Sequence, residues 1–233
     1  MSAPLYKYVI ETLIERIASG ELAPGIMLPS EGDLGAELGV SQGTARKALS
    51  ELERRGIVSR RQGVGTFVTA RTPESALFHF FRLRDADGSQ VSPVLEDESV
   101  QRRRALKPER EVLFGNPDSV YEIERVRSVR SERVVHERSI VPAGLFPGLP
   151  ERNPLPNTLY VLYQRAYSVA IVQASEAVRA VTGMPDVCRQ LSVPDGTPLL
   201  RVERRAADLA GRVVELRISH FVTGDRFYAV DLA

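Results

Sequence analysis

The segment that most restricts the fold of this chain spans residues 39–68 and reads GVSQGTARKALSELERRGIVSRRQGVGTFV. Ser41 is a favourable helix N-cap, and the apolar residues after it recur at helical spacing as far as Gly56. Beyond Gly56, two short apolar stretches flank a basic turn that contains Gly63 and Gly65. The segment therefore predicts a helix that is followed at once by a β-hairpin.

Two further helices are expected before this segment. The apolar residues of 5–17 follow a helical period, and their helix should end near Gly20. Ser30 can cap a second, short helix, with Asp33 completing a weak capping box, and this helix should stop at Gly39. Two helices joined by so tight a turn are typical of a helix-turn-helix, and the hairpin after them makes it a winged helix.

The formal net charge of the chain is only +1, but its charges are unevenly distributed. Residues 1–40 contain six acidic and two basic side chains, whereas residues 41–70 contain six basic and two acidic ones. A module with one basic half can hold a polyanion on one face. Nucleic-acid binding is therefore expected at the predicted long helix and hairpin.

Side chains suited to DNA lie in the first turns of the long helix and in the hairpin. Glutamine can pair with adenine and arginine with guanine, while threonine can contact a phosphate or a thymine methyl group. Glycines let the backbone of the hairpin approach a phosphate or the minor groove. A solvated amphipathic helix beside a structural hairpin is the alternative, but the order of the elements favours DNA binding. The candidates are Gln42, Thr44, Arg46, Lys47, Arg60, Arg61, Gln62, Gly63 and Gly65.

A length of 233 residues suits two domains, and 43% hydrophobic with 26% charged residues is the balance of a chain that buries ordinary cores. The one cysteine, Cys188, excludes an intramolecular disulfide. Neither a secretion leader nor an apolar run of about 18 residues is apparent. We expect an intracellular, cytoplasmic protein with no membrane partner.

The pattern changes after the hairpin, where TARTPES reads as a connector and short alternating strands follow. We expect a winged-helix domain at 1–70, a linker at 71–75 and a second domain at 76–233. Strands joined largely by hairpin-like turns, with occasional helices, predict an α+β domain on a mostly antiparallel sheet. The expected strands are 76–84, 94–103, 120–129, 133–141, 168–180, 198–207, 213–223 and 226–232, and the expected helices 107–114, 157–165 and 184–191.

One expected strand reads VYEIERVR, and its alternation places Arg125 and Arg127 on the same inward face as Tyr121 and Ile123. Two guanidinium groups on a covered face need anionic partners. One interpretation is a bound phosphate or carboxylate, which suits the planar donor fork of arginine. The other is a salt bridge to internal acids, for which the candidates are Glu137, Glu176 and Glu215.

No set of residues with the roles of acid, base and nucleophile is apparent in the second domain. The three histidines, His79, His136 and His220, are too dispersed for metal-ligand spacing, and each is interpreted as a strand residue. Cys188 lies between apolar neighbours on a short helix and is interpreted as a packing residue. We expect neither catalysis nor a metal or cofactor.

Residues 20–58 and 60–68, GELAPGIMLPSEGDLGAELGVSQGTARKALSELERRGIV and RRQGVGTFV, resemble the GntR family of bacterial transcription regulators. In that family the start of the short helix, the recognition helix and the wing contact an operator. The resemblance differs at Gln42, where many members carry arginine, so the operator base read there should differ. The residues that it implies for DNA binding are Ser30, Ser41, Thr44, Arg46, Lys47, Gln62, Gly63, Gly65 and Thr66.

The second domain resembles the ligand-binding domain of the HutC branch of that family, called UTRA, which has the fold of chorismate lyase. The matching segments include IERVR, HERSIVPAGLFPGL, TLYVLYQRAY, ASEAVRAV, LSVPDGTPLLRVERR and VVELRISHFVTGDRFYAV. Some relatives bind phosphorylated sugars, and the resemblance implies that the residues of this chain at their phosphate-holding positions are Arg125, Arg127 and Thr158. It assigns the ligand's hydroxyl groups to Glu137, Tyr160, Glu215 and Phe221.

This chain departs from that pattern in three ways. Phe221 lacks the hydroxyl that some relatives place there, and Thr158 replaces the more usual serine. In VVELRISHFV, the apolar residues alternate so that Glu215 and Phe221 fall on the other face of the strand. Either the pocket lies on that other face, or a bulge intervenes. The apolar set is Val214, Leu216, Ile218 and Val222.

Together these features predict a homodimeric transcriptional repressor that binds two operator half-sites, because one helix and one wing make few contacts with DNA. A small acidic metabolite, such as a phosphosugar, an organic acid or an aromatic acid, would release the operator by favouring one arrangement of the DNA-binding heads. The alternatives are an enzyme of the chorismate lyase type fused to a DNA-binding head, and a dimeric DNA-binding protein that takes no ligand.

Overall fold

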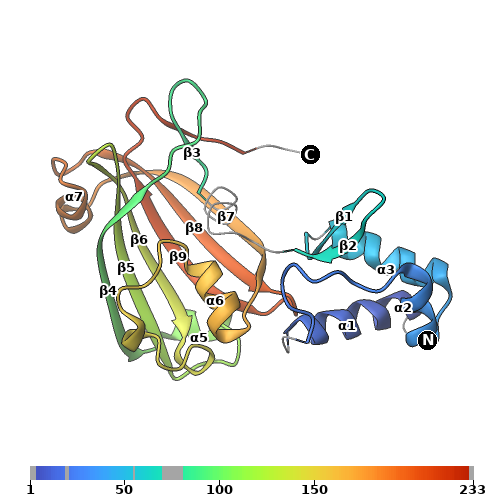
Figure 1. Ribbon diagram of the computed structural model, residues 1–233. Helices are drawn as coiled ribbons and strands as arrows, with labels where there is room; N and C mark the ends of the chain where they lie inside the picture. The colour runs from blue at the N-terminus through green and yellow to red at the C-terminus, as the bar shows by residue number, and fades with distance from the viewer. Residues whose placement is uncertain (1–3, 19–20, 55, 70–80, 231–233) are drawn as a thin grey trace.

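The computed structural model describes residues 4–18, 21–54, 56–69 and 81–230 (Figure 1). Over these residues the chain forms a small unit of helices with a hairpin and a larger unit built on a sheet. The expected linker, the expected start of the second domain at residue 76 and His79 lie outside the described residues. The domain boundaries therefore stay predictions.

The small unit has the order of three helices and a hairpin that the sequence predicts. Ser30 caps α2 by accepting a hydrogen bond from the backbone N–H of Asp33 at 3.2 Å, and Ser41 caps α3 through the N–H of Thr44 at 3.2 Å. These caps determine where the helices begin, so the winged helix is confirmed. Its elements are α1 (Leu5–Ala18), α2 (Glu31–Glu37), α3 (Gln42–Arg54), β1 (Val58–Arg61) and β2 (Gly65–Val68).

Gly35 allows the tight turn between α2 and α3. A Cβ atom at this position would lie 2.9 Å from the carbonyl oxygen of Val40 and 3.3 Å from the backbone nitrogen of Gln42, so a larger residue would push the turn away. The core behind the turn fixes α3 with its first turn at the surface. Its fully buried leucines are Leu13, Leu34, Leu49 and Leu52.

The large unit is a six-stranded sheet in the order β4-β5-β6-β9-β8-β7, and every neighbouring pair in it is antiparallel. The expected α+β fold on a mostly antiparallel sheet is confirmed. The strands are β4 (Val94–Arg104), β5 (Ser119–Val129), β6 (Glu132–Pro142), β7 (Ile171–Thr182), β8 (Pro198–Asp208) and β9 (Val213–Phe221).

Two expected strands are only partly formed over the residues that the structure describes. β3 (Leu83–Arg84) and β10 (Phe227–Tyr228) pair with each other in a separate two-stranded sheet, whereas the expected ranges were 76–84 and 226–232. A strand extends only as far as its partner does, and sequence alternation does not reveal where pairing stops. The described part of β3 is therefore a short accessory strand beside the main sheet.

The helices of the large unit lie close to their expected positions. They are α5 (Lys107–Val112), α6 (Leu159–Tyr167) and α7 (Pro185–Leu191). Two short 3-10 segments, Ala143–Leu145 and Pro150–Arg152, precede α6 and were absent from the prediction because such turns carry no periodic signal.

Helix α6 lies over one face of the sheet, which we call the inner face (Figure 1). Tyr160 and Tyr163 of this helix belong to the same buried cluster as Ile123 of β5 and Val214 of β9. The opposite, outer face carries the exposed Arg138 and the partly exposed Ile218. Any buried polar group on the inner face is therefore shielded from water by α6 and the chain that leads into it.

The turn between β8 and β9 joins the large unit to the small one. Leu209 in this turn is buried in the same apolar cluster as Ile17 and Ile57 of the winged helix, and Val172 of β7 packs against that cluster. Asp208 holds the turn by accepting hydrogen bonds from the backbone N–H groups of residues 210 and 212 at 3.0 Å. The strands that carry inner-face residues thus end in contact with the DNA-binding unit.

Candidate nucleic-acid interface and effector site

The first turns of α3 present their polar side chains to solvent. Gln42, Arg46 and Lys47 are exposed, while Thr44 is half-buried and its hydroxyl lies 2.9 Å from that of Ser41. Because Ala45, Ala48 and Leu49 face the core, the remaining side chains on this part of the helix must point outward. This is the geometry that a helix needs in order to enter a DNA groove.

Glu31, in the first turn of α2, connects α3 with the hairpin. Its carboxylate accepts hydrogen bonds from Arg46 Nε at 2.7 Å and from Arg60 Nη2 at 3.3 Å. Arg60 also lies 3.4 Å from Glu53 and donates to Ser50 at 3.1 Å. Ion pairs this exposed contribute about 0 to 1 kcal/mol each, so DNA phosphates can replace Glu31 at little cost.

The hairpin combines exposed donors with two glycines. Arg61 lies with its guanidinium 4.5 Å from the ring centre of Phe67, and Gln62 is exposed beside it. Gly63 has a φ of +71°, which a tight turn requires. Gly65 has a φ of +150°, which also favours glycine, and a Cβ there would lie 2.9 Å from the sulfur of the exposed Met27. The structure thus places the exposed tip of the hairpin at residues 62–64.

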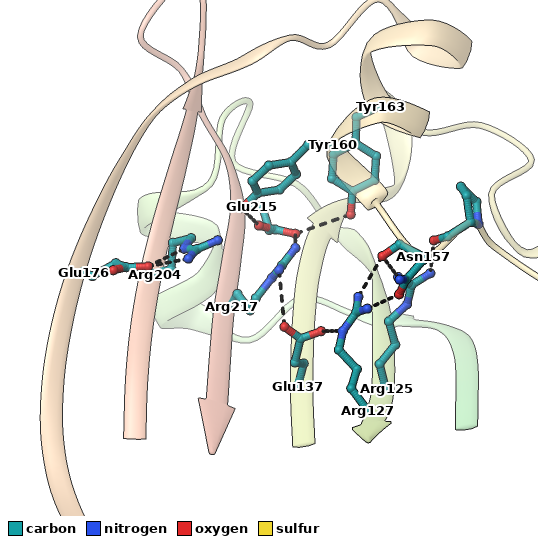
Figure 2. A network of polar contacts seen from close by, with 11 residues as sticks. Arg125, Arg127, Glu137, Asn157, Tyr160, Tyr163, Glu176, Arg204, Glu215 and Arg217 are labelled. Carbon is teal, nitrogen blue, oxygen red and sulfur yellow. Dashed lines mark hydrogen bonds and ion pairs between the residues drawn. The ribbon is translucent and has the colours of Figure 1, made fainter. Parts of the chain in front are cut away.

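The expected anion site lies in a network of buried polar side chains on the inner face (Figure 2). Four arginines enter it from three strands, and each forms an ion pair with a carboxylate. Of the three acids expected as partners of Arg125 and Arg127, only Glu137 pairs with one of them, whereas Glu176 and Glu215 pair with other arginines and Arg125 pairs with Glu98. The pairs are Arg125 with Glu98, Arg127 with Glu137, Arg204 with Glu176, and Arg217 with Glu215.

Arg125 is the most deeply buried of these cations, with 1% of its side chain exposed. Besides Glu98, its Nη atoms donate to the backbone oxygen of Pro156 at 3.0 Å and to that of Asn157 at 3.3 Å. Burial, together with the like charge of Arg127, lowers the pKa of Arg125 from its ordinary value. The guanidinium is held by oxygen atoms from both β4 and the segment before α6.

Arg127 divides its donors between a charged and a neutral partner. Its Nε donates to Glu137 at 2.7 Å, while its Nη atoms donate to the side-chain oxygen of Asn157 and, at 2.9 Å, to the backbone oxygen of Asn157. Burial by itself would raise the pKa of Glu137, but Arg127 and Arg217 outweigh burial and lower it to about 2. Glu137 is therefore ionised over the whole neutral range.

Arg217 joins this pair to the residues of α6. It lies 3.5 Å from Glu137 and donates to Glu215 at 2.8 Å, and the carboxylate of Glu215 accepts from the hydroxyl of Tyr160 at 2.5 Å. The hydroxyl of Tyr163 lies 3.4 Å from the same carboxylate. Burial and the charge of Glu215 raise the pKa of Tyr160 to about 12, so this tyrosine stays a donor.

Five of the seven expected effector residues are placed together by this network, and two are not. Thr158 is the half-buried N-cap residue of α6, and its side chain forms no capping hydrogen bond. Phe221 packs instead between Phe81 and Tyr228, with ring centres 6.0 and 5.7 Å away. Phe221 belongs to an apolar cluster, as expected for a side chain without a hydroxyl group.

The apolar alternation of β9 does not identify which face of the strand is buried against α6. Glu215 and Phe221 are buried on the inner face, whereas Leu216 and Ile218 lie on the outer face and are partly exposed. The inner face is thus the one that carries the charged residues, and the register is regular over 216–221. A register shift lies just before it, between Val213 and Glu215, and Val214 of the expected apolar set belongs to the inner-face cluster. The reason is that Arg217, two residues along the same strand, and Tyr160 of α6 pair with the buried Glu215, which sequence alternation does not show.

Several members of the network were not singled out as site residues from the sequence. Arg217 alternates with polar residues on its strand, Arg204 lies in a stretch with three other charged residues, 201, 203 and 205, and Glu98 lies on a strand of mixed charge. Asn157 lies in a loop and carries no recognisable signal. Glu31 was likewise missed at the DNA-facing surface, because an acid is not expected beside DNA.

His136, His220 and Cys188 take no part in this site. His136 and His220 lie on the outer face with ring centres 6.2 Å apart, and burial and His136 lower the pKa of His220 to about 4. Cys188 is buried on α7. Among the described residues, no group of three metal-ligating side chains comes together.

The fold and the two sites define a class of protein, a winged-helix DNA-binding regulator joined to a sensing domain. Residues 5–68 match the model of the bacterial regulatory proteins of the gntR family, and residues 99–228 match that of the UTRA domain. The chain belongs to the GntR family of transcription regulators, in the group whose second domain is UTRA.

Similar regulators support this assignment over nearly the whole chain. The histidine utilization repressor of Pseudomonas putida is 30% identical over 94% of this chain and 88% of that protein. The mannosyl-D-glycerate transport/metabolism system repressor MngR of Escherichia coli is 28% identical over 95% of this chain and 93% of its own length. The solved ligand-binding domain of a GntR-family regulator from Bordetella bronchiseptica is 26% identical, with a TM-score of 0.59 over 66% of this chain and 98% of that domain.

The protein is therefore a DNA-binding transcriptional regulator with an effector domain, and not an enzyme of the chorismate lyase type. The expected family and fold, and the expected role as a DNA-binding regulator with an effector domain, are confirmed by these matches. Among the described residues, no helix is both long enough and apolar enough to span a bilayer.

Proposed function

We propose that this regulator is a homodimeric repressor that binds two operator half-sites and releases them when a small acidic metabolite binds at Arg125 and Arg127. One observation carries the effector part of the proposal. The Nη atoms of both buried arginines donate to neutral oxygen atoms of the segment before α6. A charged acceptor forms stronger hydrogen bonds with arginine than a neutral one, so an acid group can replace these partners.

The names of similar regulators support an effector with an acid group. Two of them are named for histidine utilization and for mannosyl-D-glycerate transport and metabolism. Histidine and mannosyl-D-glycerate both carry a carboxylate, which suits the arginine pair. A further regulator, from Escherichia coli, is named for fructoselysine utilization. We infer that this chain senses a small catabolic substrate or its phosphorylated or acidic derivative.

In the DNA part of the proposal, α3 reads bases and the wing holds the backbone or the minor groove. Gln42, Arg46 and Lys47 are exposed on one end of α3, and the wing tip at 62–64 is exposed beside β1. The remaining expected contacts come from Ser30, Ser41, Thr44, Arg60, Arg61, Gly65 and Thr66. Two copies double the phosphate contacts, which is why we propose a dimer. Such a regulator acts where the chromosome lies, in the cytoplasm.

A thermal-shift screen of small anionic metabolites tests this function, with Arg127→Ala as the control variant. We expect a metabolite that raises the melting temperature of the wild type, leaves Arg127→Ala unchanged, and weakens wild-type binding to a DNA fragment selected from a random pool. The selected fragment should still bind Arg127→Ala. A DNA complex that ignores every stabilising anion would instead support the ligand-independent DNA-binding protein.

A further inference from the structure

We propose that Asn157 fills the anion position of the arginine pair in the unliganded protein, so that the effector must displace it. This inference rests on the proposed effector site and adds a residue that sets its affinity. The side-chain and backbone oxygens of Asn157 accept hydrogen bonds from both Nη atoms of Arg127, and its backbone oxygen also accepts from Arg125. Figure 2 shows both guanidinium groups directed at this residue.

The two oxygens of Asn157 present the same kind of acceptor pair that a carboxylate or phosphate presents, but without a charge. A charge-assisted hydrogen bond is roughly twice as strong as a neutral one, so an acid group gains by the exchange. The charged partners hold other positions on the same guanidiniums. Glu137 bonds the Nε atom of Arg127, and Glu98 pairs with one Nη atom of Arg125. Asn157 is thus the partner of Arg127 that an anion can replace without leaving a buried carboxylate unpaired.

The segment that carries Asn157 is held by a few contacts near the surface. The amide nitrogen of Asn157 donates to the backbone oxygen of Pro93 at 3.1 Å, and the backbone N–H of Leu155 donates to Glu98 at 2.8 Å. Asn157 is half-buried and Pro156 is exposed, whereas the arginines beneath them are buried. Asn157 can therefore leave its position without opening the sheet.

Displacement of Asn157 would affect α6 directly, because the helix begins two residues later. Thr158 is its N-cap residue and provides no side-chain cap, so an anion beside this end meets uncapped N–H groups and the positive end of the helix dipole. Tyr160 of the same helix contacts Glu215, and Gln164 lines a small cavity beside Ile57 of the winged helix. The displaced residue is thus joined by one short helix to the DNA-binding unit.

Inorganic phosphate serves as the probe, titrated calorimetrically into the full-length protein and two variants at position 157. Asn157→Ala removes the side-chain oxygen, and we expect it to bind phosphate roughly tenfold more tightly, the size of one hydrogen bond to a charged group. Asn157→Asp puts a carboxylate on Arg127 and should weaken phosphate binding by at least about tenfold. Without phosphate, Asn157→Asp should melt at a higher temperature than the wild type because the added charge pairs with Arg127.

Two controls keep the inference separate from the proposed function. Gln101→Ala removes an amide that donates to Glu122 at 3.3 Å on the exposed outer side of β4, and it should leave phosphate binding unchanged. Arg127→Gln should abolish phosphate binding if the effector site is correct. If Asn157→Ala does not fold, Asn157→Ser gives the same comparison with a shorter side chain.

The outcomes are distinct. If Asn157→Ala binds phosphate no more tightly than the wild type, or does not bind it at all, the role of Asn157 is overturned. The effector site itself survives that result if the wild type binds phosphate and Arg127→Gln does not. If Arg127→Gln binds phosphate as well as the wild type does, both the effector site and the role of Asn157 are wrong.

Discussion

Arginines face two different environments in the two units of this protein. Arg46 on the winged helix has 62% of its side chain exposed and shares Glu31 with Arg60, whereas Arg125 and Arg127 on the sheet expose 1% and 4%. Exposed pairs exchange partners at little cost, but a buried charge that loses its partner costs several kcal/mol. The exposed arginines are therefore available to any polyanion, and the buried ones only to a ligand that keeps their charge paired.

The buried network is balanced, with a carboxylate for each of its four arginines. An added anion must therefore take the place of a neutral partner, or one of the carboxylates must leave. Glu137, whose pKa is about 2, remains charged at neutral pH. An anion is therefore expected to replace the neutral oxygen partners of the buried arginines. This requirement distinguishes the buried site from the exposed arginines of the winged helix, which attract any polyanion.

The largest effect should come from breaking a buried pair. Arg125→Ala leaves Glu98 buried beside empty space, and we expect a loss of about 3 to 5 kcal/mol in the free energy of unfolding, measured in urea. Arg46→Ala, its exposed counterpart, should change the same quantity by no more than about 0.5 kcal/mol. Equal losses in the two variants would remove the distinction between the two environments.

Acid should reveal the next largest effect through Glu137. Its folded-state pKa lies below the ordinary value of 4.5, so its stabilisation is complete above that value and is lost as the pH falls from about 4.5 to about 2. The contribution at pH 7 is about 3 kcal/mol. Glu137→Gln should flatten this part of the curve of unfolding free energy against pH. A curve of unchanged slope in that variant would assign the acid sensitivity to other carboxyl groups.

Truncation of Leu209 should weaken the link between the units. Leu209→Ala removes a buried side chain from the winged-helix core at the turn between β8 and β9, and we expect a loss of about 2 kcal/mol. Calorimetry should then show two unfolding transitions where the wild type shows one. A single unshifted transition would mean that the contact contributes nothing to cooperativity.

On the exposed side, Arg46→Ala should weaken binding to a selected DNA fragment by about 1 to 3 kcal/mol if Arg46 reads a base. Lys47→Ala, if it contacts a phosphate, should weaken binding to all sequences alike and reduce the salt slope by about one. Fluorescence anisotropy over a series of salt concentrations separates the two. If both variants lose affinity equally for all DNA sequences, both residues contact the DNA backbone and neither reads a base.

The smallest effect is expected at Glu31. Glu31→Gln removes the carboxylate that Arg46 and Arg60 share, so unfolding should change by less than about 1 kcal/mol. DNA binding should strengthen by a few-fold, because the two arginines no longer have to give up a charged partner. Weaker DNA binding would show that Glu31 positions these arginines for DNA.

The winged helix could be predicted almost residue by residue because its signals are local. Ser30 and Ser41 mark helix starts, and Gly56, with a φ of +67°, follows the end of α3. Hydrophobic spacing then fixed the inward faces of these helices. The same local signals found the main strands of the sheet and placed Arg125 and Arg127 on its covered face.

Tertiary structure alone decided what those arginines meet. The order β4-β5-β6-β9-β8-β7 brings Glu137 of β6 and Arg217 of β9 close to Arg127, although Glu137 and Arg217 are 80 residues apart in the sequence. It also buries the charged face of β9 and leaves Leu216 on the outer face, where it packs partly buried against a small apolar cluster. Asn157 became the partner of both arginines only through the packing of its loop on the sheet. Sequence alternation determines which face a side chain takes, whereas the partners on that face depend on strand order and loop packing.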